Sequence, residues 1–268
     1  MDLLEFTKVE GLGNDFLLFD LRAREDLEGW IARLARAAPT LCDRRRGVGG
    51  DGLLLVTPPR SATATASMIV INHDGSRPEM CGNGLRCVAA QVAPVGARCT
   101  IDTDAGPLSC ARVSDGHVEV DMGAAELLGV RTPAAAPSRE FLAVSMGNPH
   151  AVAFVGEGEE PEALARTLGP GVERDPLFPH RTNVEFARVD GDVITLWVWE
   201  RGCGITEACG TGACATAAAA VARGFVAADR ELVVRLPGGP LQIRVPTRGG
   251  VIMRGPAHAV FLGRVVVA

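Results

Sequence analysis

One ordered set of short motifs occurs twice in this sequence, and that repeat restricts the possible folds more than any other feature. The matched pairs lie about 130 residues apart: Gly13-Asn14 with Gly147-Asn148, Cys81-Gly82-Asn83-Gly84 with Cys209-Gly210-Thr211-Gly212, Ala105-Gly106-Pro107-Leu108 with Gly238-Gly239-Pro240-Leu241, and Met122-Gly123 with Arg254-Gly255. Ordered matches at a nearly constant spacing are hard to obtain by chance. We therefore expect a tandem duplication of an α/β unit.

The boundary between the two copies is predicted from composition. Residues 123–139 are rich in alanine and proline and show no clean period, which is typical of a connection. With 47% of its 268 residues hydrophobic, the chain can bury a sizeable core. We expect one domain of residues 1–122 plus 258–268, which carries Cys81, and a second of residues 123–257, which carries Cys209.

The helix that follows Cys209 is predicted to be buried on every side. Its sequence, GACATAAAAVA, is small or apolar all the way round, so no face of it suits water. Further helices are expected at 27–36 and 82–93, and strands at 53–56, 68–72, 192–199, 231–236, 241–245 and 251–254. The predicted fold class is α/β (α+β), with two pseudo-symmetric domains of mostly antiparallel strands, each wrapped around a central helix.

Charge and hydropathy favour a small-molecule partner. The formal net charge is −5 and the basic runs are short, so neither a nucleic acid nor a membrane partner is expected. The longest small apolar run falls short of the roughly 20 residues that span a bilayer, and the acidic N-terminus lacks the layout of a signal peptide. We expect a cytoplasmic protein.

The cysteines and the single lysine bear on cofactors. Because the N-terminus lacks the layout of an export signal, the eight cysteines are expected to be mostly reduced thiols. They include no CxxC pair, so no metal site is expected. Cys42, Cys87, Cys99, Cys110 and Cys214 are expected to be small buried hydrophobic residues. Lys8 is the only residue that could anchor pyridoxal phosphate, and no phosphate-binding pattern surrounds it. We expect no cofactor.

Cys81 and Cys209 are each predicted to begin a helix, which is an unusual place for a thiol. Backbone N–H groups at a helix start favour a thiolate and can bind a carboxylate. The helix dipole supplies at most about 2 kcal/mol, enough to bring the pKa of a thiol close to neutrality. If the two thiols face each other across an interdomain cleft, one can remove a proton from a carbon while the other returns a proton to the opposite face. This arrangement inverts a stereocentre.

Three stretches of the sequence resemble the signatures of the diaminopimelate epimerase family. They are NHDGSRPEMCGNGLRC at 72–87, SMGNPH at 145–150 and ERGCGITEACGTGA at 200–213, with GLGNDF at 11–16 and TNVEF at 182–186 in support. The resemblance covers nearly the whole chain. It implies two similar α/β domains, usually in a homodimer, and a pyridoxal-free interconversion of LL- and meso-diaminopimelate that feeds lysine and peptidoglycan synthesis.

The resemblance also implies residue roles. Cys81 and Cys209 would be the acid/base pair, with His150 and Glu200 as auxiliary groups. The substrate would be bound by Asn14, Asn72, Gly82, Asn83, Asn148, Asn183, Glu200, Arg201, Gly210 and Thr211. Some relatives have Gln where this chain has Gly52, so that contact is not carried over. Cys203 is an additional thiol near these residues and is expected to be inert.

Three alternatives remain open from the sequence. Proline and hydroxyproline racemases share the two-cysteine design, but the pair Glu200-Arg201 and the asparagine set favour a substrate with a second charged end. A thiol-based redox enzyme would also use two cysteines, although its usual CxxC motif is missing. A non-catalytic protein that binds amino acids is the third possibility.

Overall fold

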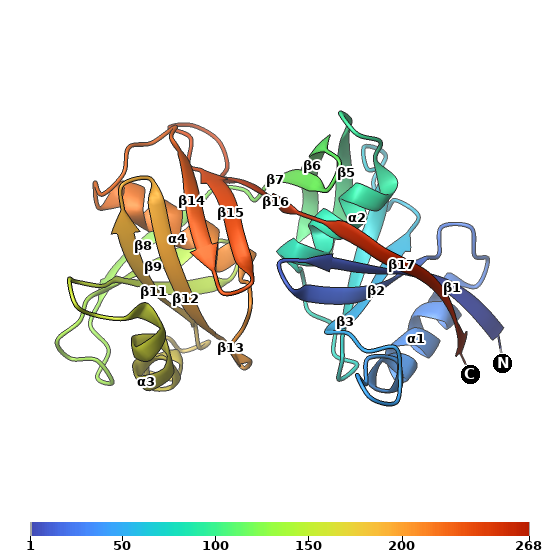
Figure 1. The fold of residues 1–268 in the computed structure, drawn as a ribbon, viewed down its shortest axis with the longest axis horizontal. Helices are drawn as coiled ribbons and strands as arrows, with labels where there is room; N and C mark the ends of the chain where they lie inside the picture. The colour runs from blue at the N-terminus through green and yellow to red at the C-terminus, as the bar shows by residue number, and fades with distance from the viewer. Residues whose placement is uncertain (1, 268) are drawn as a thin grey trace. The chain divides into compact units, whose positions relative to one another are not determined.

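The computed structural model describes residues 2–267, and it separates into two compact units. The first unit contains Met1–Val120 and Gly255–Ala268, and the second contains Asp121–Arg254. The divisions thus fall after residues 120 and 254, where the sequence predicts 122 and 257. Each unit combines two helices with a set of paired strands (Figure 1).

Over its described residues, 2–120 and 255–267, the first unit has two helices and eight strands. Its elements are β1 (Asp2–Gly11), β2 (Asn14–Asp20), α1 (Leu27–Leu41), β3 (Gly52–Thr57), β4 (Ala66–Asn72), α2 (Gly82–Val92), β5 (Arg98–Thr103), β6 (Gly106–Ser114), β7 (His117–Asp121) and β17 (His258–Val267). The pairing runs from β17 through β1, β2, β3, β4, β5 and β6 to β7. Two of these pairs, β2/β3 and β4/β5, are parallel, and the others are antiparallel.

The second unit follows the same scheme. Its elements are β8 (Glu126–Arg131), β9 (Phe141–Ser145), β10 (Pro149–Phe154), α3 (Pro161–Glu173), β11 (Asn183–Asp190), β12 (Val193–Glu200), β13 (Gly204–Ile205), α4 (Gly210–Ala222), β14 (Glu231–Leu236), β15 (Gly239–Arg244) and β16 (Ile252–Pro256). The pairing runs β8, β9, β10, β11, β12, β14, β15, β16, and the parallel pairs are β10/β11 and β12/β14. The order of parallel and antiparallel pairs is therefore identical in the two units.

Each parallel pair is joined through a helix, since parallel neighbours cannot be connected by a tight hairpin. Helix α1 connects β2 to β3, α2 connects β4 to β5, α3 connects β10 to β11, and α4 lies between β12 and β14. The sequence predicts mostly antiparallel strands, and the two parallel pairs in each unit are the exception. Helices α2 and α4 lie in the connections of two of these parallel pairs, β4/β5 and β12/β14.

The last strand of the chain belongs to the first unit. Strand β17 is antiparallel to β1 over nearly its whole length, from Asp2↔Val267 to Glu10↔His258 (Figure 1). The side chain of Val267 is fully buried with Leu4, Phe6 and helix α1 in the core. Strand β8 has the corresponding place in the second unit, because it follows the hairpin of β6 and β7 but pairs with β9.

The helices confirm one prediction and correct another. Residues 212–220 of α4 are all buried, as its uniformly small apolar sequence predicts. Helix α3 was not predicted; it contains Gly169, Pro170 and Gly171, which weaken a helical pattern. Gly169 packs against Trp199, whose Cβ would lie 2.6 Å from an added Cβ. Among residues 2–267, no helix has the length and apolar character needed to cross a membrane.

The cysteines outside the two motifs are distributed as predicted. Cys42, Cys87, Cys99, Cys110 and Cys214 are buried, whereas Cys203 is exposed. All eight thiols are free. Burial raises the pKa of Cys42 to about 11 and that of Cys87 to about 12, so both remain protonated and inert at neutral pH.

Candidate functional site

Cys81 is the N-cap residue of α2. Its backbone is extended, with φ −139° and ψ 114°, and its Sγ accepts the N–H of Gly84 at 3.4 Å. The side chain is partly exposed. Glycine at position 84 lets the helix start pack closely on β3, because an added Cβ would lie 2.6 Å from the Leu54 side chain. The thiol therefore lies at the positive end of a tightly packed helix.

Asn14 connects Cys81 to β2. The thiol donates to Asn14 Oδ1 at 3.8 Å, and Asn83 Nδ2 donates to the same oxygen at 3.3 Å. Asn14 Nδ2 donates to Asp51 Oδ2 at 2.5 Å, so the carboxylate fixes which end of the amide faces the thiol. Asp51 was not predicted. It directly precedes Gly52. A Cβ added to Gly52 would lie 2.4 Å from the Ile71 carbonyl oxygen, so position 52 leaves no room for a side chain.

A buried arginine lies under this helix. Arg86 has no exposed surface; its Nη2 donates to Asn83 Oδ1 at 2.9 Å and its Nε to the Pro256 carbonyl at 3.1 Å. Asn72 ends β4, and its Nδ2 donates to Ser76 Oγ at 2.9 Å within the following turn. The structure thus brings Asn14, Asn83 and Cys81 into direct contact, while Asn72 is bonded to its own turn.

Cys209 is the corresponding N-cap residue of α4. Its Sγ accepts the N–H of Gly212 at 3.4 Å and lies 3.7 Å from Thr211 Oγ1. As the sequence predicts, this cysteine begins its helix, but only 6% of the residue is exposed. The second thiol is therefore buried, whereas Cys81 is partly exposed.

A chain of hydrogen bonds leads from Thr211 into the core of the second unit. Asn148 Nδ2 donates to Thr211 Oγ1 at 3.3 Å, and Asn148 Oδ1 lies 3.0 Å from His150 Nε2. His150 Nδ1 lies 2.6 Å from Glu185 Oε1, and neither side chain has exposed surface. Glu185 was missed at the sequence level, although it stands in TNVEF, two residues after Asn183 and so on the same face of β11.

The space next to the second glycine of each motif, Gly84 or Gly212, is filled differently in the two units. An added Cβ on Gly84 would meet Leu54, whereas one on Gly212 would lie 2.9 Å from Glu185 Oε1. The first unit thus places an apolar side chain next to its cysteine motif, and the second unit places a carboxyl group there. The two thiols have similar backbone geometry but different electrostatic surroundings.

Burial and charge both act on Cys209. Burial raises the pKa of its thiol well above the ordinary value, and the charges of Glu200 and Glu185 raise it further. Burial likewise raises the pKa of Glu200, which accepts hydrogen bonds from Thr206 and Cys209, and that of Glu185, against the opposing effect of His150. The expectation of a thiol pKa near neutrality is therefore wrong for Cys209, which holds its proton at neutral pH.

Asn183 and Glu200 flank the turn that carries Arg201. Asn183 Nδ2 donates to the Pro149 carbonyl at 3.0 Å, and its Oδ1 accepts the N–H of Arg201 at 2.9 Å. The guanidinium of Arg201 is exposed and donates to the His180 carbonyl at 3.4 Å. Asn183 thus acts on the backbone of Arg201, which leaves the guanidinium at the surface of the unit.

Replacement of Gly212 by alanine tests how tightly the second site is packed. Helix propensity alone would stabilise the variant by about 1 kcal/mol. An added Cβ would, however, lie 2.9 Å from Glu185 Oε1 and 3.1 Å from Cys209 Sγ. We expect the free energy of unfolding to fall by about 1–3 kcal/mol, measured by urea denaturation. An increase in stability would contradict the close packing of these three residues.

Comparison with known proteins gives a consistent match along the chain. A family model described as "Diaminopimelate epimerase" matches residues 6–128 and 142–260. A diaminopimelate epimerase of Microcystis aeruginosa is 43% identical over 284 residues, covering 97% of this chain and 98% of the relative. One from Rhodospirillum centenum is 42% identical over 273 residues, covering 96% and 91%.

Solved structures share the fold at much lower identity. A hydroxyproline epimerase from Agrobacterium vitis, with bound trans-4-hydroxy-L-proline, has a TM-score of 0.70 and 17% identity, covering 98% of this chain and 92% of that one. A PhzF-family phenazine biosynthesis protein from Bacillus anthracis has a TM-score of 0.71 and 14% identity, with full coverage of both chains. At such identities the likeness concerns the mixed α/β fold alone.

Proposed function

Since the chain belongs to the diaminopimelate epimerase family, we propose that it inverts a Cα centre of diaminopimelate by proton transfer between Cys81 and Cys209. The protein is an isomerase, an amino-acid epimerase of lysine biosynthesis. The single observation that carries the mechanism is that both cysteines are N-caps of corresponding helices, each with its sulfur bonded to the third helical N–H.

The reaction needs one thiolate and one thiol. The thiolate takes the Cα proton from one face of the substrate and becomes a thiol, and the electron pair of the broken C–H bond remains on the substrate carbanion. The second thiol then gives its proton to the opposite face and becomes a thiolate. The raised pKa of Cys209 supports its starting as the acid, because the free enzyme holds that proton at neutral pH.

The backbone amides that follow each cysteine would bind the reacting carboxylate. Gly82, Asn83, Gly210 and Thr211 lie in the first turns of their helices, where N–H groups lack intrahelical acceptors. Such preorganised donors stabilise the charge that develops on the substrate. This step requires that the two helix starts flank one Cα atom.

The second amino-acid end of the substrate would be bound by Arg201 and Glu200, together with Asn14, Asn72, Asn148 and Asn183. The exposed guanidinium of Arg201 suits a carboxylate, and Glu200 offers an acceptor for an ammonium group. His150 supports this set indirectly, since its ring orients Asn148. We propose that the enzyme acts in the cytoplasm, where its eight free thiols would remain reduced.

We further propose that the chain is a tandem duplication of one α/β domain. The identical order of parallel and antiparallel pairs in the two units supports this, as do the matched N-cap cysteines. The boundaries would lie near residues 122 and 257. Strands β8 and β17 then correspond, each pairing with the first strand of a unit.

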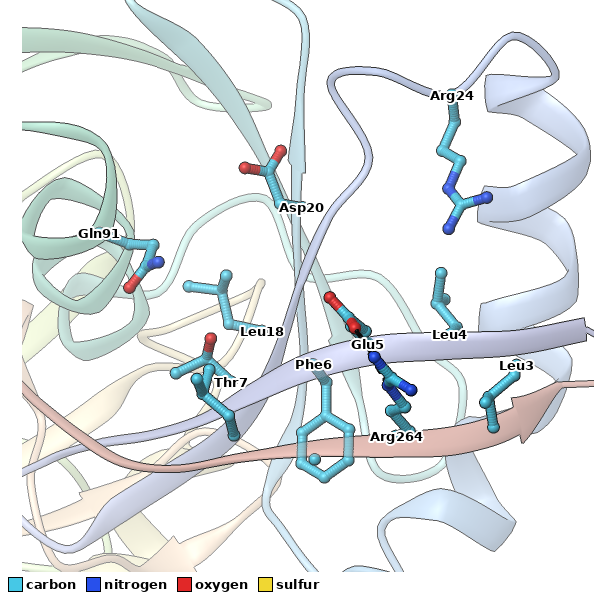
Figure 2. Close-up of a pocket in the computed structure, with 12 residues that line it drawn as sticks. Leu3, Leu4, Glu5, Phe6, Thr7, Leu18, Asp20, Arg24, Gln91 and Arg264 are labelled. Carbon is cyan, nitrogen blue, oxygen red and sulfur yellow. Dashed lines mark hydrogen bonds and ion pairs between the residues drawn. The ribbon is translucent and has the colours of Figure 1, made fainter.

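A homodimer is proposed through the outer face of β1 and β17. The strands present Leu3, Val266 and Leu262 on one face, with exposed fractions of 58%, 59% and 82%. Between them, Glu5 and Arg264 form an ion pair at 2.5 Å beside a hollow of about 1020 Å³ (Figure 2). Opposite charges flanked by apolar residues make this face complementary to a second copy of itself, related by a twofold axis.

Replacement of Leu262 by arginine tests this dimer. It introduces a charge into the apolar part of the face, so we expect the dimer dissociation constant to rise at least about 100-fold, measured by sedimentation equilibrium. Val130→Arg is the matched control, since Val130 is 42% exposed on β8 in the second unit. Equal dissociation of both variants, or a dimer unaffected by Leu262→Arg, would rule out this face.

Direct assay tests the proposed activity. Purified protein is incubated with LL-diaminopimelate, meso-diaminopimelate, L-proline or trans-4-hydroxy-L-proline, and each stereoisomer is separated by chiral chromatography. We expect interconversion of the first two compounds and no change in the others. Epimerisation of the proline compounds alone would establish a proline or hydroxyproline epimerase instead. This is the second candidate function, because a hydroxyproline epimerase shares the fold at 17% identity.

A further inference from the structure

The turn after β12 has an unusual backbone conformation, which is fixed by hydrogen bonds. It contains Gly202 and Gly204, both in the left-handed region with φ of 81° and 80°. The N–H of Cys203 donates to the Glu200 carbonyl at 3.1 Å, which closes the turn. Because Glu200 ends β12 and Arg201 is the first residue of the turn, the direction of both side chains depends on how the turn is fixed.

Glu173, the last residue of α3, accepts a hydrogen bond from the backbone of this turn. Only 2% of the residue is exposed. Its Oε1 accepts the N–H of Gly202 at 2.8 Å and Arg181 Nη2 at 2.8 Å, and its Oε2 accepts Trp199 Nε1 at 2.9 Å. A buried carboxylate is costly unless it is paired and hydrogen-bonded, and these three donors meet that requirement.

The carboxylate is itself held in place by packing. Helix α3 contacts β12 so closely that a Cβ added to Gly169 would lie 2.6 Å from Trp199 Cβ. This close packing places Glu173, at the end of α3, beside the strand that leads into the turn. Asn183 Oδ1 accepts the adjacent amide, that of Arg201, at 2.9 Å. Two consecutive N–H groups are thus fixed by side chains from α3 and β11.

We propose that Glu173 is a positioning residue of the epimerase, which directs Arg201 and Glu200 through the Gly202 amide. This inference rests on the proposed role of Arg201 in binding the distal end of the substrate. Arg181 completes the arrangement by neutralising Glu173 on its solvent side, where the Arg181 side chain is 44% exposed. Glu173 itself has no contact with the reacting atoms in this scheme.

Glu173→Gln tests the proposal, because the carboxamide weakens the Gly202 contact in either orientation. Its neutral oxygen accepts more weakly than a carboxylate oxygen, and its nitrogen does not accept at all. We expect about a tenfold increase in KM for diaminopimelate with kcat changed less than about twofold, as for lost uniform binding. Hydrogen exchange of the Gly202 amide should be at least about tenfold faster.

Trp199→Phe, which removes one donor and keeps the Gly202 contact, is a milder second variant that should leave this exchange unchanged. Ala165→Gly is the matched control for stability, since Ala165 is buried in the same helix away from the turn.

The double variant Glu173→Gln/Arg201→Lys separates positioning from general destabilisation. If Glu173 acts through Arg201, adding Glu173→Gln to Arg201→Lys should change KM by less than about twofold. A full additional tenfold loss, or Gly202 exchange no faster than in Ala165→Gly, would overturn the inference. A different result would be faster Gly202 exchange in Glu173→Gln together with a normal KM in Arg201→Lys. That result would remove Arg201 from the binding set, and the proposed function on which the inference rests would fail.

Discussion

Cys81→Ala and Cys209→Ala are each expected to reduce epimerisation of diaminopimelate by at least about 10³-fold. Each variant removes the only group proposed to move a proton on one face of the substrate, and general acid–base catalysis contributes about 10²–10⁴-fold. The remaining thiol can exchange a proton on its own face but cannot invert the centre. The measurement is the rate of meso product formation from LL-diaminopimelate.

Two other cysteines provide matched controls for these variants. Cys42 is buried in the core of the first unit, and Cys214 is buried within α4 of the second. Cys42→Ala and Cys214→Ala remove a thiol of the same size from the same units, so we expect a small loss of stability and nearly normal turnover. Normal turnover in Cys81→Ala or in Cys209→Ala would end the two-thiol mechanism.

Glu200→Gln is expected to act in two opposite directions. Burial is the main cause of the raised pKa of Cys209, and the negative charge of Glu200 is the next. Removing that charge makes the thiolate less unfavourable, so the pKa of Cys209 falls and the thiolate appears at lower pH. Alkylation of Cys209 by iodoacetamide, followed by mass spectrometry of the modified peptide, should therefore shift to lower pH.

Epimerisation should nevertheless become about 10²-fold slower in Glu200→Gln, because Glu200 accepts a hydrogen bond from Cys209 and belongs to the proposed substrate site. Glu207→Gln is the matched control, since Glu207 is exposed and lies two residues before Cys209 in the sequence. It removes the same charge and should change neither measurement. An alkylation profile that stays in place, or shifts to higher pH, would contradict the effect of Glu200 on this thiol.

The parts of the site that could be predicted are those carried by adjacent residues. Cys81 and Cys209 stand out because glycines and an apolar helix follow them directly, and the structure makes both of them N-caps. Asn14 and Asn148 could be matched because they occupy the same place in two copies. Strand β14 was predicted with its observed bounds, from apolar residues between turn signals.

The parts that could not be predicted depend on contacts between distant segments. Asp51, Glu173 and Glu185 lie in separate segments of the chain, and nothing in their local sequence indicates that they face an asparagine, a turn or a histidine. The pKa expectation for Cys209 failed for the same reason. A helix start favours a thiolate locally, but burial and the carboxylates of β11 and β12 outweigh it.

The two halves of the site differ where a duplication would make them equal. Arg86 in the first unit and Cys214 in the second occupy matching places after the cysteine motifs, and Leu54 in the first corresponds to Glu185 in the second. The first unit therefore buries a cation near its thiol, and the second buries a carboxyl group. Burial and the charges of Glu200 and Glu185 raise the pKa of Cys209, which suits a thiol that starts the reaction protonated.

The most direct test of the two-thiol mechanism is the fate of the Cα proton during the first turnovers in D₂O. Unlabelled LL-diaminopimelate is incubated with the enzyme, and label and stereochemistry are followed together by mass spectrometry after chiral separation. The two-thiol mechanism predicts that the first meso product carries one solvent deuterium at the inverted Cα, while the remaining LL substrate is still unlabelled. Early meso product that retains the original proton would contradict the mechanism, because a single group would then have carried the proton to both faces.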